Sequence, residues 1–485
     1  MKLGSVLVVA LLSAGACSVG GTNVSLGSGP LESLSGAGGD TSAGGAGLAT
    51  GTAGLNVEPS PMDMDCPDGK KTSISGTVWD PAGEVQLYNA VVYVPREPGQ
   101  ALPKFPDMVA CEKCTDSVPA RAVTLSGPDG TFRLDDVPYG NVEVVVQLGK
   151  WRRKQVIPVK PCQDNPITDP NLTRLPKSHA EGDIPRIALS TGHSDALECL
   201  LRKIGIADSE FTTDAEDGQV NLFVGCEEDN LEADGTKHTG ASRFLNGSAF
   251  PSTNQLFDSG ELPKYDVVVF SCEGHKCDTI QTPAHVAQLV DFADRGGRVF
   301  LDHDHYNWLN HANSPIKSAA QFSSSPDDIP SPLVTQINRS FPKGEAFAQW
   351  LVKVSASPKL GMLDIYTAKT SVESLSPNRS QSWIYRTDLP APGFFYFTIG
   401  TPVAIQDDDP APEACGRVVF TDLHLSKTGG GEPTSDDFSD QLTPFPNGCT
   451  TTALSAQEKA LEFMFFDLSS CVQQESAIPT PPVVK

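Results

Sequence analysis

An irregular segment, 163–183, divides the chain into two parts with different sequence patterns. It is rich in Pro, Asn and Asp and shows no hydrophobic period. Before it, apolar residues alternate over short runs, as in strands; after it, strand-like runs alternate with helical ones. A chain of 485 residues also exceeds what one core usually organises. The sequence therefore predicts a multidomain protein, with an all-β domain at 61–165, a linker at 166–183 and an α/β domain at 184–475.

Short strands rich in Val and Thr predict that the first domain is a small β-sandwich; the clearest of them, 141–148, alternates apolar and polar side chains. The runs Gly76–Asp80, Asn89–Val92 and Gly130–Leu134 resemble the carboxypeptidase regulatory-like domain, a transthyretin-type sandwich. This resemblance implies a non-catalytic accessory module that is loosely related to carbohydrate-binding folds. The chain departs from the family by an insertion at about 96–120.

Strand-like and helical segments alternate in the second part, which predicts a flavodoxin-like α/β domain with a mainly parallel sheet and helices on both faces. The expected strands are 184–189, 220–225, 265–271, 298–301 and 417–422. Thr282-Pro283, and Ser455 with Glu458, mark the starts of two helices. The stretch at about 306–416 is less regular and is expected to be an insertion that holds a helix at 344–354 and strand-like pieces such as 393–400.

Three runs in this part carry a second resemblance: Tyr265–Ser271, Leu289–His305 and Gly416–His424. They resemble the class I glutamine amidotransferase-like fold, and within it the trehalose-utilisation-like branch. Such proteins carry a strand, a helix that ends in two glycines, and strands that end in His at these places. The order of both parts also resembles a set of bacterial surface lipoproteins.

The N-terminus has the features of a secretory signal peptide, expected at 1–16. One lysine precedes a short apolar run, and small residues lead to Cys17. Ala14-Gly15-Ala16 before Cys17 resembles a bacterial lipoprotein signal, which implies a lipid on this cysteine and an anchor at the outer membrane or cell surface. Because Leu usually stands where this chain has Ala14, cleavage without a lipid, giving a periplasmic or secreted protein, stays an alternative.

Two segments are expected to be disordered. Residues 17–60 are rich in Gly and Ser and cannot bury a core, so they suit a flexible tether that holds folded domains away from a membrane. The last residues, 476–485, are expected to form a disordered tail.

The net charge of −24 argues against a nucleic-acid partner, because phosphate binding needs a basic face. One basic island, 149–154, places Lys150, Arg152 and Lys154 on one face of an extended strand. Two readings stay open: a strand that pairs with the protein's own carboxylates, and a patch for an anionic polymer. We expect the first.

Twelve cysteines are present, and an exported chain oxidises most of those that remain beside Cys17. Their number is odd, so one thiol is free or pairs outside the chain. Cys111 and Cys114 have the spacing of half a zinc site, but its other half is missing nearby, so we expect them in disulfides. Cys272 is also expected in a disulfide, because Cys277 lies five residues on.

The run Ser-Cys-Glu-Gly-His at 271–275 resembles the nucleophile turn of amidotransferases, which exposes a thiolate beside a histidine. In chain order, it follows the strand before the one that carries that nucleophile. The later position, Asp302-His303, has no cysteine. Together with the expected disulfide, this argues against cysteine catalysis.

Polar residues follow several predicted strands. They include five of the nine histidines, each with a nearby carboxylate: His193, His275, His303, His305 and His424, with Asp195, Glu273, Asp302, Asp304 and Asp422. Ligands of an open parallel sheet bind beyond the carboxyl ends of its strands, so these side chains are expected to gather at one edge. Along an extended strand, His303 and His305 point one way, and Asp302 and Asp304 the other.

Three readings of this edge stay open. The histidines bind a divalent metal such as zinc, with Asp302 and Asp304 as candidate catalytic carboxylates of a hydrolase that acts on a glycan or an amide. Alternatively, Tyr306 and Trp308 help to bind an uncharged ligand such as a sugar. Most simply, polar residues gather where strands leave the core, and Asp195 caps the next helix.

No compact metal motif such as HExxH occurs, so zinc is the candidate cofactor but none is assigned. We therefore expect a non-catalytic surface lipoprotein that is held to the membrane by its lipid and binds a glycan or an envelope protein. The metal-dependent hydrolase is the alternative.

Overall fold

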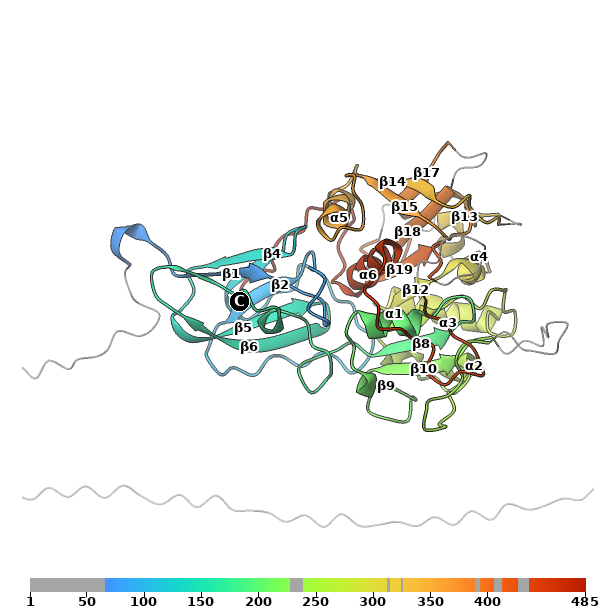
Figure 1. Cartoon of the computed structure of the whole chain (residues 1–485), viewed down its shortest axis with the longest axis horizontal. Coiled ribbons are helices and arrows are strands. Elements are labelled where there is room, and N and C mark those ends of the chain that lie inside the picture. Colours follow the sequence, from blue (N-terminus) through green and yellow to red (C-terminus); the bar gives the residue numbers. More distant parts are fainter. Residues whose placement is uncertain are drawn as a thin grey trace, which may run out of the picture. The chain divides into compact units, whose positions relative to one another are not determined.

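The computed structural model describes residues 66–226, 239–311, 315–323, 326–388, 393–404, 412–425 and 436–485 (Figure 1). These residues belong to one compact unit, Pro59–Lys485. The predicted signal peptide at 1–16, the lipidation site Cys17 and the tether at 17–60 lie outside the described residues. The described fold mixes helices with strands in several sheets, the largest of which has ten strands.

Two sheets occupy residues 73–166. One has the order β4-β1-β7 and the other β3-β2-β5-β6; the strands are β1 Ser73–Thr77, β2 Val91–Pro95, β3 Ala120–Leu125, β4 Thr131–Asp135, β5 Gly140–Leu148, β6 Trp151–Val159 and β7 Asp164–Pro166. The predicted core face of β5 is confirmed by the buried Val142, Val144 and Val146. Val145, on the opposite face, is buried as well, because Leu102 and Val118 of the insertion pack near it.

Six neighbouring strands of the ten-stranded sheet are parallel. In spatial order they are β19 Gly416–Thr421, β12 Arg298–Leu301, β11 Val267–Phe270, β8 Ile187–Thr191, β10 Val220–Val224 and β9 Phe211–Thr212. Their runs of buried Val, Ile, Leu and Phe suit strands that are covered on both faces.

The rest of this sheet is antiparallel, so the sheet is mixed rather than mainly parallel. The four strands are β18 Gly393–Thr401, β17 Ser380–Arg386, β14 Leu333–Ile337 and β15 Met362–Ile365. All four come from the stretch 306–416, which the sequence analysis treated as an irregular insertion. The connection from β17 to β18 is too short for the crossover that a parallel pair needs, so these strands form a hairpin. A small separate sheet pairs β13 Ala320–Phe322 with β16 Val372–Leu375.

Helices cover both faces of the ten-stranded sheet. Apolar residues of α1 Leu197–Lys203, α5 Pro342–Lys353 and α6 Ala456–Ser469 share a core with Val267 and Val269 of β11. Those of α2 Thr253–Asp258, α3 Pro283–Asp294 and α4 Tyr306–Asn310 share the other core with Val268 and Phe270. The predicted helix starts are confirmed, since Thr282 caps α3 and Ser455 and Glu458 form the capping box of α6. Short 3-10 turns are η1 Pro67–Gly69, η2 Pro170–Leu172, η3 Asp208–Glu210, η4 Leu262–Lys264, η5 His303–His305 and η6 Pro315–Ala319.

Ten of the cysteines in the described part form five disulfides: Cys66–Cys162, Cys111–Cys415, Cys114–Cys471, Cys199–Cys449 and Cys226–Cys277. The expectation for Cys111 and Cys114 is confirmed, and both bonds tie the insertion to the C-terminal part. The expectation for Cys272 is wrong. Cys277 bonds to Cys226, and Cys272 is the free, buried thiol that the odd number implied. Disulfides in this number are consistent with an exported protein.

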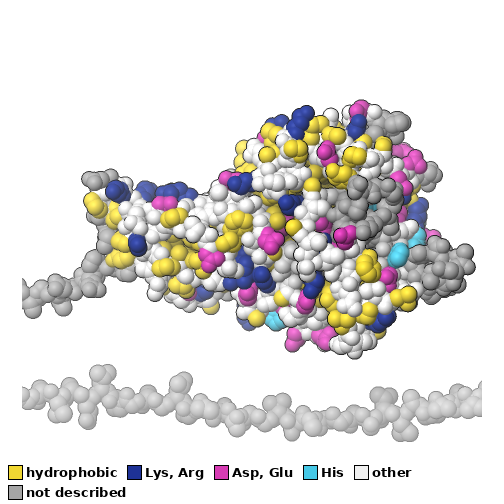
Figure 2. Space-filling model, in the orientation of Figure 1, with side chains coloured by type: hydrophobic (Ala, Val, Ile, Leu, Met, Phe, Trp, Pro, Cys, Tyr) yellow, Lys and Arg dark blue, Asp and Glu magenta, His cyan; other side chains and the backbone are white. Residues whose placement is uncertain are grey.

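The basic island pairs with the protein's own carboxylates, as expected. Lys150 Nζ lies 2.5 Å from Asp266 Oδ1, and Arg152 Nη2 lies 2.9 Å from Asp183 Oδ2. Lys154 makes a similar pair with Glu143 at 2.8 Å. Basic and acidic side chains also lie next to one another on the face shown in Figure 2.

The C-terminal residues 476–485, predicted to be a disordered tail, are described here. Val484 pairs with Val118 of the insertion, and Lys485 donates its backbone N–H to the carbonyl of the same residue. Within the described ranges, no helix combines the length and apolar character needed to cross a bilayer.

Candidate functional site

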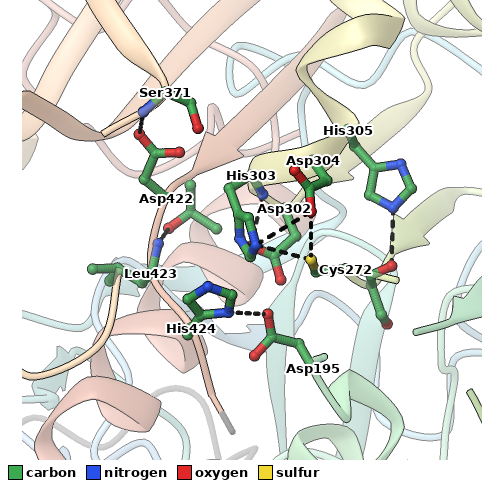
Figure 3. A network of polar contacts seen from close by, with 12 residues as sticks. Asp195, Cys272, Asp302, His303, Asp304, His305, Ser371, Asp422, Leu423 and His424 are labelled. Carbon is green, nitrogen blue, oxygen red and sulfur yellow. Dashed lines mark hydrogen bonds and ion pairs between the residues drawn. The ribbon is translucent and has the colours of Figure 1, made fainter. Parts of the chain in front are cut away.

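The residues that follow four parallel strands converge at one edge of the sheet (Figure 3). Asp195 follows β8, Cys272 follows β11, Asp302 and His303 follow β12, and His424 follows β19. Because these strands are neighbours and run in the same direction, their carboxyl ends meet, as predicted.

Cys272 and His303 form the centre of the cluster. Cys272 Sγ lies 2.8 Å from His303 Nε2, and the backbone N–H of Gly274 donates to the sulfur at 3.2 Å. His303 Nδ1 lies 2.8 Å from Asp302 Oδ1. Since Nδ1 donates to that carboxylate, the lone pair of Nε2 faces the sulfur.

Asp195 and His424 complete the cluster from the other side. His424 Nδ1 lies 2.9 Å from Asp195 Oδ2, and the backbone N–H of Leu425 donates to Asp195 Oδ1 at 2.5 Å. The rings of His303 and His424 are 3.9 Å apart at their centroids. One ligand atom each of Asp195, Cys272 and His303 lies within 4.8 Å of the others.

The sequence analysis allowed Asp195 to cap α1, but Asp195 does not cap this helix in the structure. The N-cap residue is Ala196, which makes no side-chain cap. The Asp195 backbone N–H instead donates to the carbonyl of Cys272 at 3.2 Å. Gly192 permits this close approach, because a Cβ there would lie 2.2 Å from the same carbonyl oxygen. The loop after β8 thus carries Asp195 into the site.

The expected alternation of residues 302–305 is also wrong, because β12 ends at Leu301. Asp302 caps the 3-10 turn η5 by accepting from the backbone N–H of His303. In this turn, His303 and Asp304 both reach Cys272; Asp304 Oδ2 lies 3.3 Å from the sulfur. The two candidate catalytic carboxylates therefore differ in role, since Asp302 orients the imidazole and Asp304 borders the thiol.

His305 belongs to a separate, satisfied group. Its Nε2 lies 3.0 Å from Glu273 Oε2 and 2.9 Å from the carbonyl of Ser271, and its Nδ1 accepts from Trp308 Nε1 at 3.2 Å. Both ring nitrogens are engaged, so His305 has no lone pair to offer a metal. Trp308 is 1% exposed and stacks on Phe257, and Tyr306 is 2% exposed, so neither can be the sugar platform that the sequence allowed.

His193 and His275 are half-buried and are not among the residues whose ligand atoms converge. Of the five predicted metal ligands, His303 and His424 meet at the centre, and His305, His193 and His275 do not join them. The sequence analysis placed Asp195 at this edge without choosing it as a ligand, and it expected Cys272 in a disulfide instead of at the centre. The odd cysteine count was the available indication for Cys272.

Burial and nearby carboxylates shape the protonation of the cluster. Asp195, Cys272 and His303 are fully buried. Burial, followed by the charge of Asp304, raises the pKa of the Cys272 thiol well above its ordinary value. Burial, and then the charge of Asp195, raises the pKa of Asp302 well above its ordinary range, whereas burial and His424 hold the pKa of His303 well below the usual one.

Two kinds of chemistry fit this arrangement. A carboxylate, a thiolate and an imidazole are ligands that zinc prefers, and the carboxylate on the far nitrogen of His303 is the usual support of a zinc-binding histidine. The chain Cys272–His303–Asp302 also has the order of a nucleophile, a base and a residue that orients the base.

No protein-family model matches this chain, and no curated protein sequence does. Among solved structures, two chains from type II cohesin–X-dockerin complexes of Acetivibrio cellulolyticus match, one a C-terminal and the other an N-terminal interface mutant. They are 14% and 12% identical, cover 30% of this chain and 79% and 78% of their own, and both have a TM-score of 0.15. A likeness at that TM-score carries no argument about fold or function.

Proposed function

We propose that this protein is an exported metal-dependent hydrolase whose zinc-class ion is held by Asp195, Cys272 and His303. The observation that carries the proposal is the convergence of these three ligand atoms within 4.8 Å in a fully buried position. Three protein ligands leave a further coordination position for water or substrate, which is the arrangement of catalytic rather than structural zinc sites.

The charges around the three residues support a cation at this place. Asp302, Asp304 and Asp422 lie in the same network (Figure 3), and Lys369, the base whose charge acts on His303 and His424, pairs with Asp328 at 2.8 Å. Burying several carboxylates without a compensating cation is costly. A divalent ion would balance them and would hold the Cys272 thiol in its deprotonated form.

Other residues of the cluster orient the three ligands and accept protons. Asp302 fixes the tautomer and the direction of His303 through the 2.8 Å bond to Nδ1. His424 and the Leu425 N–H hold the carboxylate of Asp195. Asp304, whose side chain is 17% exposed, lies 3.3 Å from the sulfur and is placed to accept a proton. A zinc-class ion supplies Lewis-acid polarisation and activation of water. The substrate bond is accordingly one that water cleaves, in a glycan or an amide.

The proposal includes the location and the finer fold that the sequence predicted. Export is supported by the five disulfides of the described part. The signal peptide at 1–16, the lipid at Cys17 and the outer-membrane anchor rest on the sequence pattern alone. The parallel half of the large sheet supports the class I glutamine amidotransferase-like resemblance. The two sheets of residues 73–166 support a transthyretin-type sandwich that serves as an accessory module.

A cysteine hydrolase is the second candidate, because the distances Cys272 Sγ–His303 Nε2 and His303 Nδ1–Asp302 Oδ1 are both 2.8 Å. Reactive cysteines, however, lie in electropositive surroundings that favour the thiolate. Cys272 lies 3.3 Å from the carboxylate of Asp304 instead. This favours metal ligation over nucleophilic attack.

Metal analysis of the purified, disulfide-bonded chain tests the proposal. After zinc loading and desalting, we expect one ion per chain in the wild type and in the control His311→Ala, which changes an exposed histidine outside the cluster. Cys272→Ala and His303→Ala should each retain none.

Alkylation with iodoacetamide distinguishes the alternatives. Under the proposal, zinc protects Cys272, and the zinc-free thiol reacts slowly. A chain that takes up no zinc, and whose Cys272 reacts rapidly unless His303 is replaced, would instead identify the cysteine hydrolase. A chain that takes up no zinc, and whose Cys272 does not react rapidly, would favour the non-catalytic binding protein.

A further inference from the structure

A polar pocket lies beside the start of β19, whereas the proposed metal centre lies beyond the other end of this strand. Its volume is about 350 Å³, within the range of roughly 300–1,000 Å³ that is typical of small-molecule sites. The hairpin β17–β18, the residues 402–404 after it and the segment 472–476 supply most of the lining. The lining uses none of the residues of the proposed metal centre.

One wall of the pocket is a face of the hairpin. Gln381 of β17 lies opposite Thr398 of β18. Gly400 is two residues further along β18, so it lies on the same face, and it pairs with Arg417 of β19. Gly400 has no side chain to fill this place, and a Cβ there would lie 3.1 Å from the Cβ of Ala414. The register of the strands therefore sets the position of the pocket.

The segment 472–476 forms the opposite wall. The disulfide Cys114–Cys471 fixes its start, and Val472 pairs with Lys113 of the insertion. Both walls are thus held by a disulfide or by strand pairing, so the pocket has its shape before a ligand arrives. A ligand then loses less free energy to ordering of the site.

Amide side chains supply hydrogen-bonding groups on both walls. Gln381 Nε2 donates to the carbonyl of Ser382 at 2.9 Å, and Gln473 Nε2 donates to the carbonyl of Ala477 at 3.3 Å. These bonds fix the directions of the two amides. Ser476 adds an exposed hydroxyl to the lining. Amides and hydroxyls both donate and accept, so these walls suit a ligand whose groups do the same.

The charged groups at the floor of the pocket balance one another. Arg417 and Glu475 line it, and Arg417 Nη2 lies 3.3 Å from Glu475 Oε1. Arg417 Nη1 lies 2.9 Å from Asp467 Oδ2, and Lys343 Nζ lies 2.8 Å from Asp467 Oδ1. Two acids and two bases leave this group of side chains without net charge. They therefore select neither an anion nor a cation.

The rim combines an engaged guanidinium with an apolar edge. Arg379 Nε donates to the carbonyl of Ala404 at 3.2 Å, so this side chain is already in use. Pro402, Val403 and Val472 are the apolar residues beside it in the lining. An edge of this kind suits the C–H face of a sugar ring, whose rim of hydroxyl groups then meets the polar walls.

We propose that this pocket binds a neutral, polyhydroxylated ligand of the size of a monosaccharide, with hydroxyl groups at Gln381 and Gln473 and a C–H face over Pro402. Each sugar hydroxyl both donates and accepts, as the two amides do. The balanced floor gives a charged ligand no partner for its charge, so neutral ligands are preferred. The site is independent of the proposed hydrolase function, and either can fail without the other.

Matched sugars test this inference on the full disulfide-bonded chain, at about 0.15 M salt. Glucose and N-acetylglucosamine are the neutral probes, and glucuronate is the anionic one. Saturation-transfer NMR and calorimetric titration give the affinities. We expect at least one neutral sugar to bind with a dissociation constant on the order of 1 mM, and glucuronate to bind several-fold more weakly than glucose. No binding of either neutral sugar at about 10 mM, or glucuronate binding as tightly as glucose, overturns the proposal.

Variants assign the binding to the pocket. Ser476→Trp places a large ring at an exposed position of the lining, so the fold is kept and sugar binding should be lost. Gln381→Ala should weaken binding about fivefold, as expected for one uncharged hydrogen bond. Gln321→Ala is the matched control, since Gln321 is an exposed amide of β13 and does not line the pocket.

Cys272→Ala separates this pocket from the metal centre, because it should bind sugar as the wild type does. Sugar binding that survives Ser476→Trp, or that is lost in Cys272→Ala, would place the ligand elsewhere and overturn the inference. Equal weakening by Gln321→Ala and Gln381→Ala would do the same.

Discussion

The strand β19 has a cluster of buried charges at each end, and the two clusters differ in balance. At its start, Arg417 and Lys343 meet Asp467 and Glu475; Lys343 Nζ lies 2.8 Å and Arg417 Nη1 2.9 Å from the two oxygens of Asp467. At its end, His424 joins a network of carboxylates around Cys272; Asp195 raises the pKa of His424, whereas burial and His424 lower the pKa of His303.

The first cluster can hold the fold together as it stands, because each acid has a base. Burial raises the pKa of Asp467, but Lys343 and Arg417 outweigh it and hold this pKa below the usual value. In the second cluster, burial and like charges raise the pKa of Asp302 well above its usual value. The first cluster is therefore structural, and under the proposed function the second, in which acids outnumber bases, is prepared for a cation from outside.

The largest effect is expected from breaking the balanced cluster. Lys343 is fully buried, so Lys343→Met leaves Asp467 and Glu475 with one base fewer. The free energy of unfolding should fall by about 3–5 kcal/mol, because a buried charge loses its partner. Urea unfolding with intact disulfides measures this fall.

Lys71→Met is the control, since Lys71 pairs with Asp136 at the surface, where both side chains are more than half exposed. No measurable change in the free energy of unfolding is expected there, because solvent screens the pair. If both variants lose the same amount, the balance of the buried cluster is not what stabilises this end of β19.

A somewhat smaller effect is expected at Glu198, a buried acid that accepts a hydrogen bond from Ser439 Oγ and pairs with no base in the described part of the chain. Burial raises its pKa from 4.5 to about 7. The folded state then holds a proton that the unfolded state has released between these values, so stability falls as the pH rises from 4.5 through about 7.

Glu198→Gln keeps the hydrogen-bond acceptor and cannot ionise. At pH 8, the variant should therefore be more stable than the wild type by roughly 3 kcal/mol, at about 1.4 kcal/mol for each unit of pKa shift, and the two should converge near pH 4. Thermal or urea unfolding of the zinc-free chain across this range checks the prediction. Parallel pH profiles would show that Glu198 is not the group responsible.

The sequence predicted which residues lie at the carboxyl edge of the sheet better than it predicted the directions of their side chains. Hydrophobic runs and helix caps located β8, β11, β12 and β19, and their common direction brought His303 and His424 together. The directions of side chains after a strand end were not predictable, because they depend on whether the chain stays extended. Asp302 starts a 3-10 turn instead, which turns His305 away from the cluster.

Disulfide pairing could not be predicted from the sequence either. Cys226 and Cys277 are bonded although 51 residues separate them, and this leaves Cys272 as a thiol beside His303. Nearness in sequence favoured the wrong partner, and only the fold could correct it. In the antiparallel half of the sheet, the sequence indicated β18 but not β14 and β17, which have weak local patterns and are stabilised by their neighbours.

X-ray absorption at the zinc edge tests the central claim most directly. In the zinc-loaded wild type, we expect one sulfur ligand at about 2.3 Å and nitrogen and oxygen ligands at about 2.0–2.2 Å. In Cys272→Ala, the sulfur contribution should disappear. A spectrum without sulfur in the wild type, or with the same sulfur contribution in the variant, would contradict the assignment of Asp195, Cys272 and His303 as the metal site.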